Sequence, residues 1–159
     1  FIQNNDQLTI QLDRVYNPGE HAEVQVFYSH ADVSDGAFYA SGGFVFTDCE
    51  PEGARKWFPC YDKPSDKAMT DITAKVPAGT KLGSNGKLFD SINDGSSITY
   101  KWVSRDPVAT YLTVITASTN YNLAIVNWTN PNTLEVIPIR FYYNPGENPA
   151  NIMSKTGAI

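Results

Sequence analysis

The chain has 159 residues, of which 42% are hydrophobic and 18% charged, with a formal net charge of −5 and a pI of about 4.9. This composition excludes an intrinsically disordered chain, and the length suffices for one domain with its own core. The acidic balance provides no basic face for nucleic acid or an anionic membrane, and no run of about 20 apolar residues is available to span a bilayer.

Apolar residues recur with a period of two along most of the chain, which is typical of β-strands with one buried face. Near the start, for example, Leu8, Ile10 and Leu12 alternate with polar residues. This alternation, or an excess of β-branched and aromatic residues, predicts extended segments at 7–15, 22–29, 42–46, 70–76, 97–103, 110–118 and 132–143.

Turn-forming residues separate these segments. The tetrapeptide Asn-Pro-Gly-Glu occurs at 17–20 and at 144–147, and we expect hairpin turns at Asn85-Gly86 and Asp94-Gly95. Pro138 lies inside a predicted strand, so that strand should lie at a sheet edge or contain a bulge.

About eight or nine strands are expected in all, with one turn of helix at 63–68 or at 149–155. The predicted fold is therefore all-β: an antiparallel β-sandwich, or two stacked sheets, with little helix.

The segment 47–67, TDCEPEGARKWFPCYDKPSDK, has too many charges and prolines for a core strand and too many aromatics for a solvent loop. If it continues the preceding strand, Asp48 and Glu50 point to one face and Cys49 to the other. Two carboxylates on one face attract a cation, which is an ammonium, a guanidinium or a metal ion. The alternative is a solvated acidic edge.

Two further features of this segment concern its shape. Pro51 permits a cis bond after Glu50 at a modest cost, and a cis bond would fix the direction of that carboxylate. Arg55 and Asp62 are expected to form an ion pair that locks the loop, a role that we favour over contact with a ligand.

Neither the cysteines nor the histidines predict a metal site. Cys49 and Cys60 are either a disulfide pair or two buried thiols. His21 and His30 are nine residues apart, and neither has a cysteine or a second histidine near it in the sequence, whereas a zinc site needs three or four ligands.

The segment 54–86 resembles the N-terminal β-domain of the aminopeptidase N-like zinc metallopeptidases, the gluzincins. The shared pattern has an arginine, then an aromatic residue, Pro59, Cys60, an aromatic residue, Asp62 and Pro64, and later a Val-Pro and a Ser-Asn-Gly turn. The resemblance extends to 100–123 and 136–147, and it is weak over the first 39 residues.

This resemblance implies a saddle of β-sheets, residues 1–147, that packs against a catalytic domain. Enzymes of the family remove single residues from peptide N-termini with one zinc ion, which the catalytic domain binds. The β-domain contributes a loop residue that holds the α-ammonium group of the substrate, and Glu50 occupies that position. The bond after this residue is often cis in the family.

Asp48 departs from the family pattern, because relatives commonly carry an uncharged residue there. It would be a second acceptor for the amine, or it would pair with a cation of the catalytic domain. Arg55, Asp62 and the two prolines of the shared motif would hold the loop.

The sequence contains neither an H-E-x-x-H motif nor the Gly-Ala-Met-Glu-Asn segment of the family. The chain starts at Phe1 without Met, so we expect a piece of a longer enzyme, inactive and metal-free by itself, with 148–159 beginning the linker to the catalytic domain. We also expect an exposed apolar patch at residues such as Phe44, Phe46 or Trp57, where that domain would dock.

Two alternatives remain. One is a scaffold protein that keeps this domain without catalysis. The other is a carbohydrate-binding or adhesion module that uses Trp57, Trp102 or Trp128. The low lysine content and the abundance of Asn, Ser, Thr and Tyr favour an exported protein.

Overall fold

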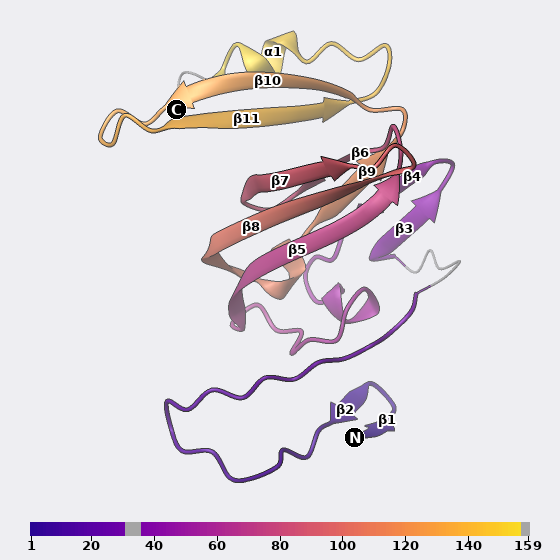
Figure 1. Cartoon of the computed structure of the whole chain (residues 1–159), viewed down its shortest axis with the longest axis vertical. Coiled ribbons are helices and arrows are strands. Elements are labelled where there is room, and N and C mark those ends of the chain that lie inside the picture. Colours follow the sequence, from indigo (N-terminus) through magenta and orange to yellow (C-terminus); the bar gives the residue numbers. More distant parts are fainter. Residues whose placement is uncertain (31–35, 157–159) are drawn as a thin grey trace.

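The computed structural model describes residues 1–30 and 36–156, which form four antiparallel sheets (Figure 1). A four-stranded sheet has the order β3-β4-β9-β6, a three-stranded sheet has the order β5-β8-β7, and β10–β11 and β1–β2 are two-stranded. The strands are β1 Ile2–Asn4, β2 Gln7–Thr9, β3 Phe38–Ser41, β4 Phe44–Thr47, β5 Lys67–Pro77, β6 Lys81–Ser84, β7 Lys87–Asn93, β8 Ser97–Ala109, β9 Ile115–Ser118, β10 Asn122–Thr129 and β11 Val136–Tyr143.

The main core lies between the four-stranded and three-stranded sheets. Leu82 of β6, Trp102 of β8 and Ala117 of β9 are its buried centre. The alternating residues of β5 contribute one face, with Ile72 and Ala74 packed against this centre. The prediction of an all-β fold with stacked antiparallel sheets is confirmed.

The β10–β11 sheet adds a further layer, drawn at the top of Figure 1. Tyr142 of β11 packs against the main core and donates a hydrogen bond of 3.0 Å to the carbonyl of Leu82. Burial raises the pKa of the Tyr142 phenol to about 12. Pro138 pairs with Asn127 in this two-stranded sheet, so it lies at an edge, as predicted.

The N-terminal third differs from the sequence prediction. Of the segment 7–15 only β2 forms a strand, paired with β1, and the described residues 10–30 contain no strand. The predicted strand at 22–29 is therefore wrong. Val24 and Val26 have the required alternation but remain 47% and 37% exposed. An alternating segment becomes a strand only where a neighbouring strand accepts its hydrogen bonds.

Both Asn-Pro-Gly-Glu tetrapeptides form the same turn. In each, the glutamate amide donates to the asparagine carbonyl over 3.1 Å, and the glutamate carboxylate accepts from the asparagine amide over 2.7 Å at 17–20 and 2.6 Å at 144–147. Both central glycines have a φ of 89°. One turn lies in the strand-free segment and the other directly follows β11.

The Asn-Gly and Asp-Gly dipeptides have different roles. Asp94-Gly95 closes the β7–β8 hairpin, as predicted. Asn85-Gly86 instead connects β6 to β7, which belong to different sheets, so the predicted hairpin is wrong.

The helices in the described part of the chain are short. The C-terminal helix α1, Ala150–Met153, forms within the predicted range 149–155. At 63–68 the structure has a turn followed by β5 instead of a helix. Two 3-10 helices, η1 at Ala54–Lys56 and η2 at Thr110–Leu112, were not predicted. Among the described residues, no helix has the length and apolar character needed to cross a membrane.

Candidate functional site

The loop that follows β4 carries the two predicted carboxylates. Asp48 and Glu50 are exposed, whereas Cys49 between them is only 3% exposed. The amide of Asp48 donates to the carbonyl of Ala37 over 2.8 Å, so the chain is still extended at this point. Burial therefore alternates along these three residues in the way that the sequence indicated.

The chain turns sharply after Glu50. The peptide bond between Glu50 and Pro51 is cis, and the amide of Gly53 donates to the carbonyl of Cys49 over 2.7 Å. The helix η1 begins directly afterwards at Ala54, which is fully buried. Glu50 thus projects from the start of a compact turn.

The turn is fixed to the rest of the domain by Asp62, whose side chain is 3% exposed. One carboxylate oxygen accepts from Arg55 Nε over 2.7 Å and from the Arg55 amide over 3.3 Å, and the other accepts from Thr110 Oγ1 over 3.3 Å. Burial acts to raise the pKa of Asp62, but the hydrogen bonds from Arg55 and Thr110 outweigh it and lower this pKa below its usual value. Arg55 and Asp62 therefore form the expected ion pair, and Asp62 also accepts a hydrogen bond from Thr110 of η2.

The outer side of the loop has weaker contacts. Glu52 pairs with Lys63 over 3.0 Å and with Arg55 over 3.1 Å, and the hydrogen bond from Lys63 lowers the pKa of Glu52. All three side chains are at least one-third exposed, so these pairs contribute little to stability. Pro59 and Pro64 are exposed in the same loop.

A small second core lies beneath the loop. Ala37, Cys49 and Ala54 are its buried members, and partly buried residues pack around them: Trp57, Phe58, Cys60 and Tyr111. Neither cysteine forms a disulfide in the structure, and Cys49 Sγ donates to the Ala37 carbonyl over 3.6 Å. Burial, with Asp62 nearby, raises the pKa of Cys60 to about 11, so this thiol stays protonated at neutral pH.

The aromatic residues expected to form a docking patch are unequally exposed. Phe46 is 41% exposed and stacks on Tyr39 with ring centroids 4.5 Å apart. Phe44 is half-buried against Tyr121, and Trp57 is half-buried against Phe58. Of the three residues named for the docking patch, only Phe46 is exposed, so the patch itself stays a prediction.

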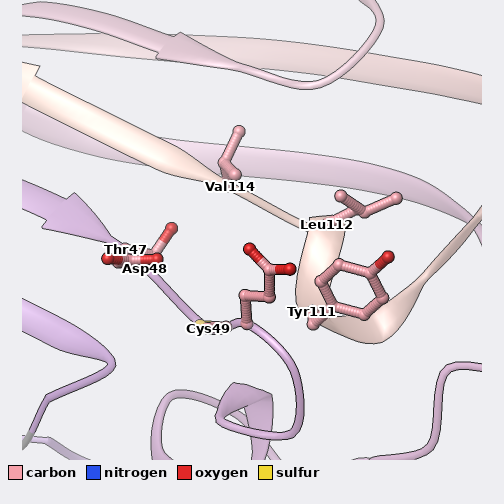
Figure 2. A pocket seen from close by; sticks show the side chains of 7 residues that line it. Thr47, Asp48, Cys49, Tyr111, Leu112 and Val114 are labelled. Atoms are coloured by element: carbon pink, nitrogen blue, oxygen red, sulfur yellow. The ribbon is translucent and has the colours of Figure 1, made fainter.

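An open depression of about 170 Å³ lies where this loop meets η2 (Figure 2). Residues 47–50 form one side, and Tyr111, Leu112 and Val114 form the other. Within the described parts of the chain, neither Asp48 nor Glu50 has a hydrogen bond or ion pair through its carboxylate. Two unpaired acceptors beside apolar side chains can receive a cation that carries a hydrophobic group.

The side of the depression formed by η2 was not foreseen from the sequence. The segment 110–118 was predicted as one strand, but it begins as η2, and only β9 is a strand. The Asn85 amide nitrogen donates to the Leu112 carbonyl over 2.8 Å, and the Val114 amide donates to Asn85 Oδ1 over 2.7 Å. The Ser-Asn-Gly sequence was the available signal, but it was interpreted as a hairpin turn.

A metal ion has no ligand set in the described residues 1–30 and 36–156. No three His, Cys, Asp or Glu side chains there are grouped so that they could hold one. Asp48 and Glu50 alone are too few for a zinc site.

A family model described as the Peptidase M1 N-terminal domain matches residues 1–112. Aminopeptidase M1-A from Oryza sativa subsp. japonica is 28% identical over 122 residues, which cover 72% of this chain and 14% of that protein. Probable aminopeptidase 1 from Sulfurisphaera tokodaii is 34% identical over 74 residues, which cover 46% of this chain and 9% of that protein. The chain thus spans only a small part of the length of these relatives.

The fold also resembles that of a solved structure, the M1 zinc metallopeptidase from Deinococcus radiodurans. The TM-score is 0.62 at 23% sequence identity, over 71% of this chain and 26% of the other. This similarity supports the arrangement of the sheets.

Proposed function

Because the chain belongs to the Peptidase M1 N-terminal domain family, we propose that it is the substrate-anchoring domain of a zinc-dependent aminopeptidase. In this proposal the domain works together with a catalytic domain that binds the zinc ion. The bound ion would act as a Lewis acid. The carboxylates of Asp48 and Glu50 would bind and orient the peptide N-terminus. The observation that carries the proposal is the unpaired Glu50 carboxylate in a depression at a rigidly held loop.

Glu50 would accept a hydrogen bond from the α-ammonium group of the peptide. Such a charge-assisted hydrogen bond contributes about 1.5–3 kcal/mol. An enzyme that removes one residue at a time must bind the free amine at a fixed distance from the first peptide bond. A carboxylate on a fixed loop sets this distance, because it holds the amine and thereby fixes the position of the first carbonyl group.

Asp48 would support this role. It is exposed on the same side of the loop as Glu50, and both residues line the depression. The ammonium group has three donors, so two carboxylates can share it. The other role proposed for Asp48 is an ion pair with a cation of the catalytic domain, and a peptide-free structure of both domains would distinguish the two.

The test is Glu50→Gln in the full-length protein, with hydrolysis of a leucyl peptide amide as the assay. We expect kcat/KM to fall by about 10- to 150-fold, because the amide keeps an acceptor but loses the charge that holds the ammonium group. The zinc content should stay the same, and Glu135→Gln, which changes an exposed glutamate at the β10–β11 turn, should have no effect. Unchanged kinetics in Glu50→Gln would refute the proposal.

The alternatives have less support in the described residues. Trp102 is only 4% exposed, and Trp57 and Trp128 are half-buried, so none of the three offers an open ring for stacking on a sugar. A scaffold without catalysis would have no need for two unpaired carboxylates in a depression. If the full-length protein neither binds zinc nor cleaves peptides, the scaffold function would replace the one proposed here.

A further inference from the structure

Gly53 is a glycine whose backbone conformation does not require glycine. Among the described glycines, only Gly53 and Gly83 have no positive φ. Gly53 has a φ of −111° and a ψ of −6°, which an alanine can also adopt. The reason for a glycine at this place therefore lies in the space around it.

The space beside the Gly53 α-carbon is filled by the start of the loop that follows β4. A Cβ atom on Gly53 would lie 3.1 Å from both the Cα atom and the carbonyl oxygen of Cys49, and 3.0 Å from the Cβ atom of Ala37. Ordinary van der Waals contacts of a Cβ atom begin at 3.4 Å, so these neighbours would have to move by a few tenths of an ångström. Two of the three atoms belong to the Cys49 backbone, which cannot rotate away as the end of a flexible side chain can.

Cys49 is held from two sides. On one side, the Gly53 amide donates to the Cys49 carbonyl over 2.7 Å. On the other side, Cys49 Sγ donates to the Ala37 carbonyl over 3.6 Å, and this carbonyl also accepts from the Asp48 amide over 2.8 Å. The absence of a side chain at Gly53 lets the chain return this close to Cys49 and close the turn.

Glu50 follows Cys49 directly, and both residues line the depression (Figure 2). Consecutive Cα atoms are linked at a constant distance of about 3.8 Å, so a displacement of the Cys49 backbone also moves Glu50. Within residues 1–30 and 36–156, the Glu50 carboxylate has no hydrogen bond or ion pair of its own. The backbone that carries Glu50 therefore determines where its carboxylate lies.

We propose that Gly53 is a positioning residue for Glu50: it leaves the space in which the turn closes, and the turn holds the Glu50 carboxylate where it meets the α-ammonium group of the peptide. This inference rests on the function proposed above, because it needs Glu50 to bind that group. A misplacement of 1 Å costs about 100-fold in rate, so a displacement of a few tenths of an ångström corresponds to about fivefold.

The test is Gly53→Ala in the full-length protein, with competitive inhibition by leucine and by 4-methylpentanoate, which is leucine without its amino group. The ratio of the two inhibition constants measures the advantage that the amino group provides. Gly53→Ala should reduce this amine advantage about fivefold. The variant should fold, because alanine fits the backbone conformation. A loss of folded protein would lower the activity and leave the ratio unchanged.

Gly83→Ala is the matched control. Gly83 also has no positive φ, and a Cβ atom there would lie 2.8 Å from the Tyr142 ring, in the main core. This variant introduces a close contact away from the loop, so it should lower stability and leave the amine advantage unchanged. A reduction as large as that in Gly53→Ala would overturn the inference, because any close contact would then have the same effect.

The Glu50→Gln background shows whether Gly53 acts through Glu50. In the wild-type background, Gly53→Ala should lower kcat/KM for a leucyl peptide amide about fivefold. In the Glu50→Gln background it should change kcat/KM little, because the charge that Gly53 positions is already lost. Equal losses in both backgrounds would overturn the inference, since they would show an effect that is independent of Glu50.

The amine advantage also separates this inference from the function on which it rests. If Glu50→Gln keeps the amine advantage, the proposed function fails and this inference fails with it. If Glu50→Gln abolishes the advantage and Gly53→Ala leaves it unchanged, only this inference fails. If Gly53→Ala does not fold, the double variant Ala37→Gly with Gly53→Ala replaces it, because it lacks the nearest of the three contacts. An unchanged amine advantage in that variant would again overturn the inference.

Discussion

Replacing Asp62 with alanine should destabilise the domain by about 3 kcal/mol. The carboxylate is 3% exposed and accepts from the Arg55 amide, from Arg55 Nε and from Thr110 Oγ1. The Arg55 side chain is 44% exposed, so it regains water when the carboxylate is removed, and its share of the loss is small. Most of the cost falls on the Arg55 amide and the Thr110 hydroxyl, which lose a charged acceptor.

Urea denaturation followed by tryptophan fluorescence measures this change in the free energy of unfolding. Asp71→Ala is the matched control, because Asp71 pairs with Arg105 over 2.6 Å but both side chains are more than half exposed. Its loss should cost less than about 1 kcal/mol. Equal losses for the two variants would refute the argument that the burial of Asp62 makes its contacts important.

The same residue predicts a pH dependence. The pKa of Asp62 is lower in the folded state than in an unfolded chain, where it is about 3.9. Its stabilising contribution is therefore fully present above that value and decreases as the pH falls towards the folded-state pKa. The difference in unfolding free energy between the wild type and Asp62→Asn should shrink below about pH 4. A difference that stays constant between pH 7 and pH 3 would contradict this prediction.

Two further predictions concern Cys60 and Gly86. Because burial raises the pKa of Cys60 to about 11, iodoacetamide at pH 8 should alkylate it far more slowly in the native protein than in urea, and equal rates would contradict its burial. Gly86→Ala should destabilise the protein by more than about 2 kcal/mol, because Gly86 has a φ of +78° and a Cβ there would collide with the Val103 carbonyl. Gly95→Ala, at a φ of +92° with no atom within 4 Å, should cost only about 1 kcal/mol, and urea denaturation compares the two.

The sequence predicted β5 and β8 well, at 70–76 and 97–103, where alternating segments pair with each other in one sheet. The segment 97–103 belongs to β8, which pairs with β7 across Asp94-Gly95 and with β5. Apolar and polar residues alternate along 97–103, and the turn-forming pair Asp94-Gly95 lies just before this segment. The segment 22–29 has the same alternation but no strand, because alternation indicates which side chains a strand would bury and says nothing about a partner.

In the candidate site, too, one side could be predicted from the sequence and the other could not. Asp48, Cys49 and Glu50 are consecutive, so the alternation of an extended chain was enough to predict their exposure. The other side of the depression depends on Asn85 reaching residues 27 and 29 positions away. That contact depends on how β6 and β9 pair in one sheet while β7 joins another, which local patterns do not determine.

The two Asn-Pro-Gly-Glu turns show that this tetrapeptide determines its own geometry. The same hydrogen bonds and the same glycine φ of 89° occur in a strand-free segment and at the end of β11. Proline fixes one φ angle, glycine accepts a positive one, and the glutamate carboxylate closes the ring onto the asparagine amide. In this chain the turn forms both directly after a strand and in a segment without strands. It is therefore a transferable unit, suited to reversing a chain in a designed protein without a sheet to support it.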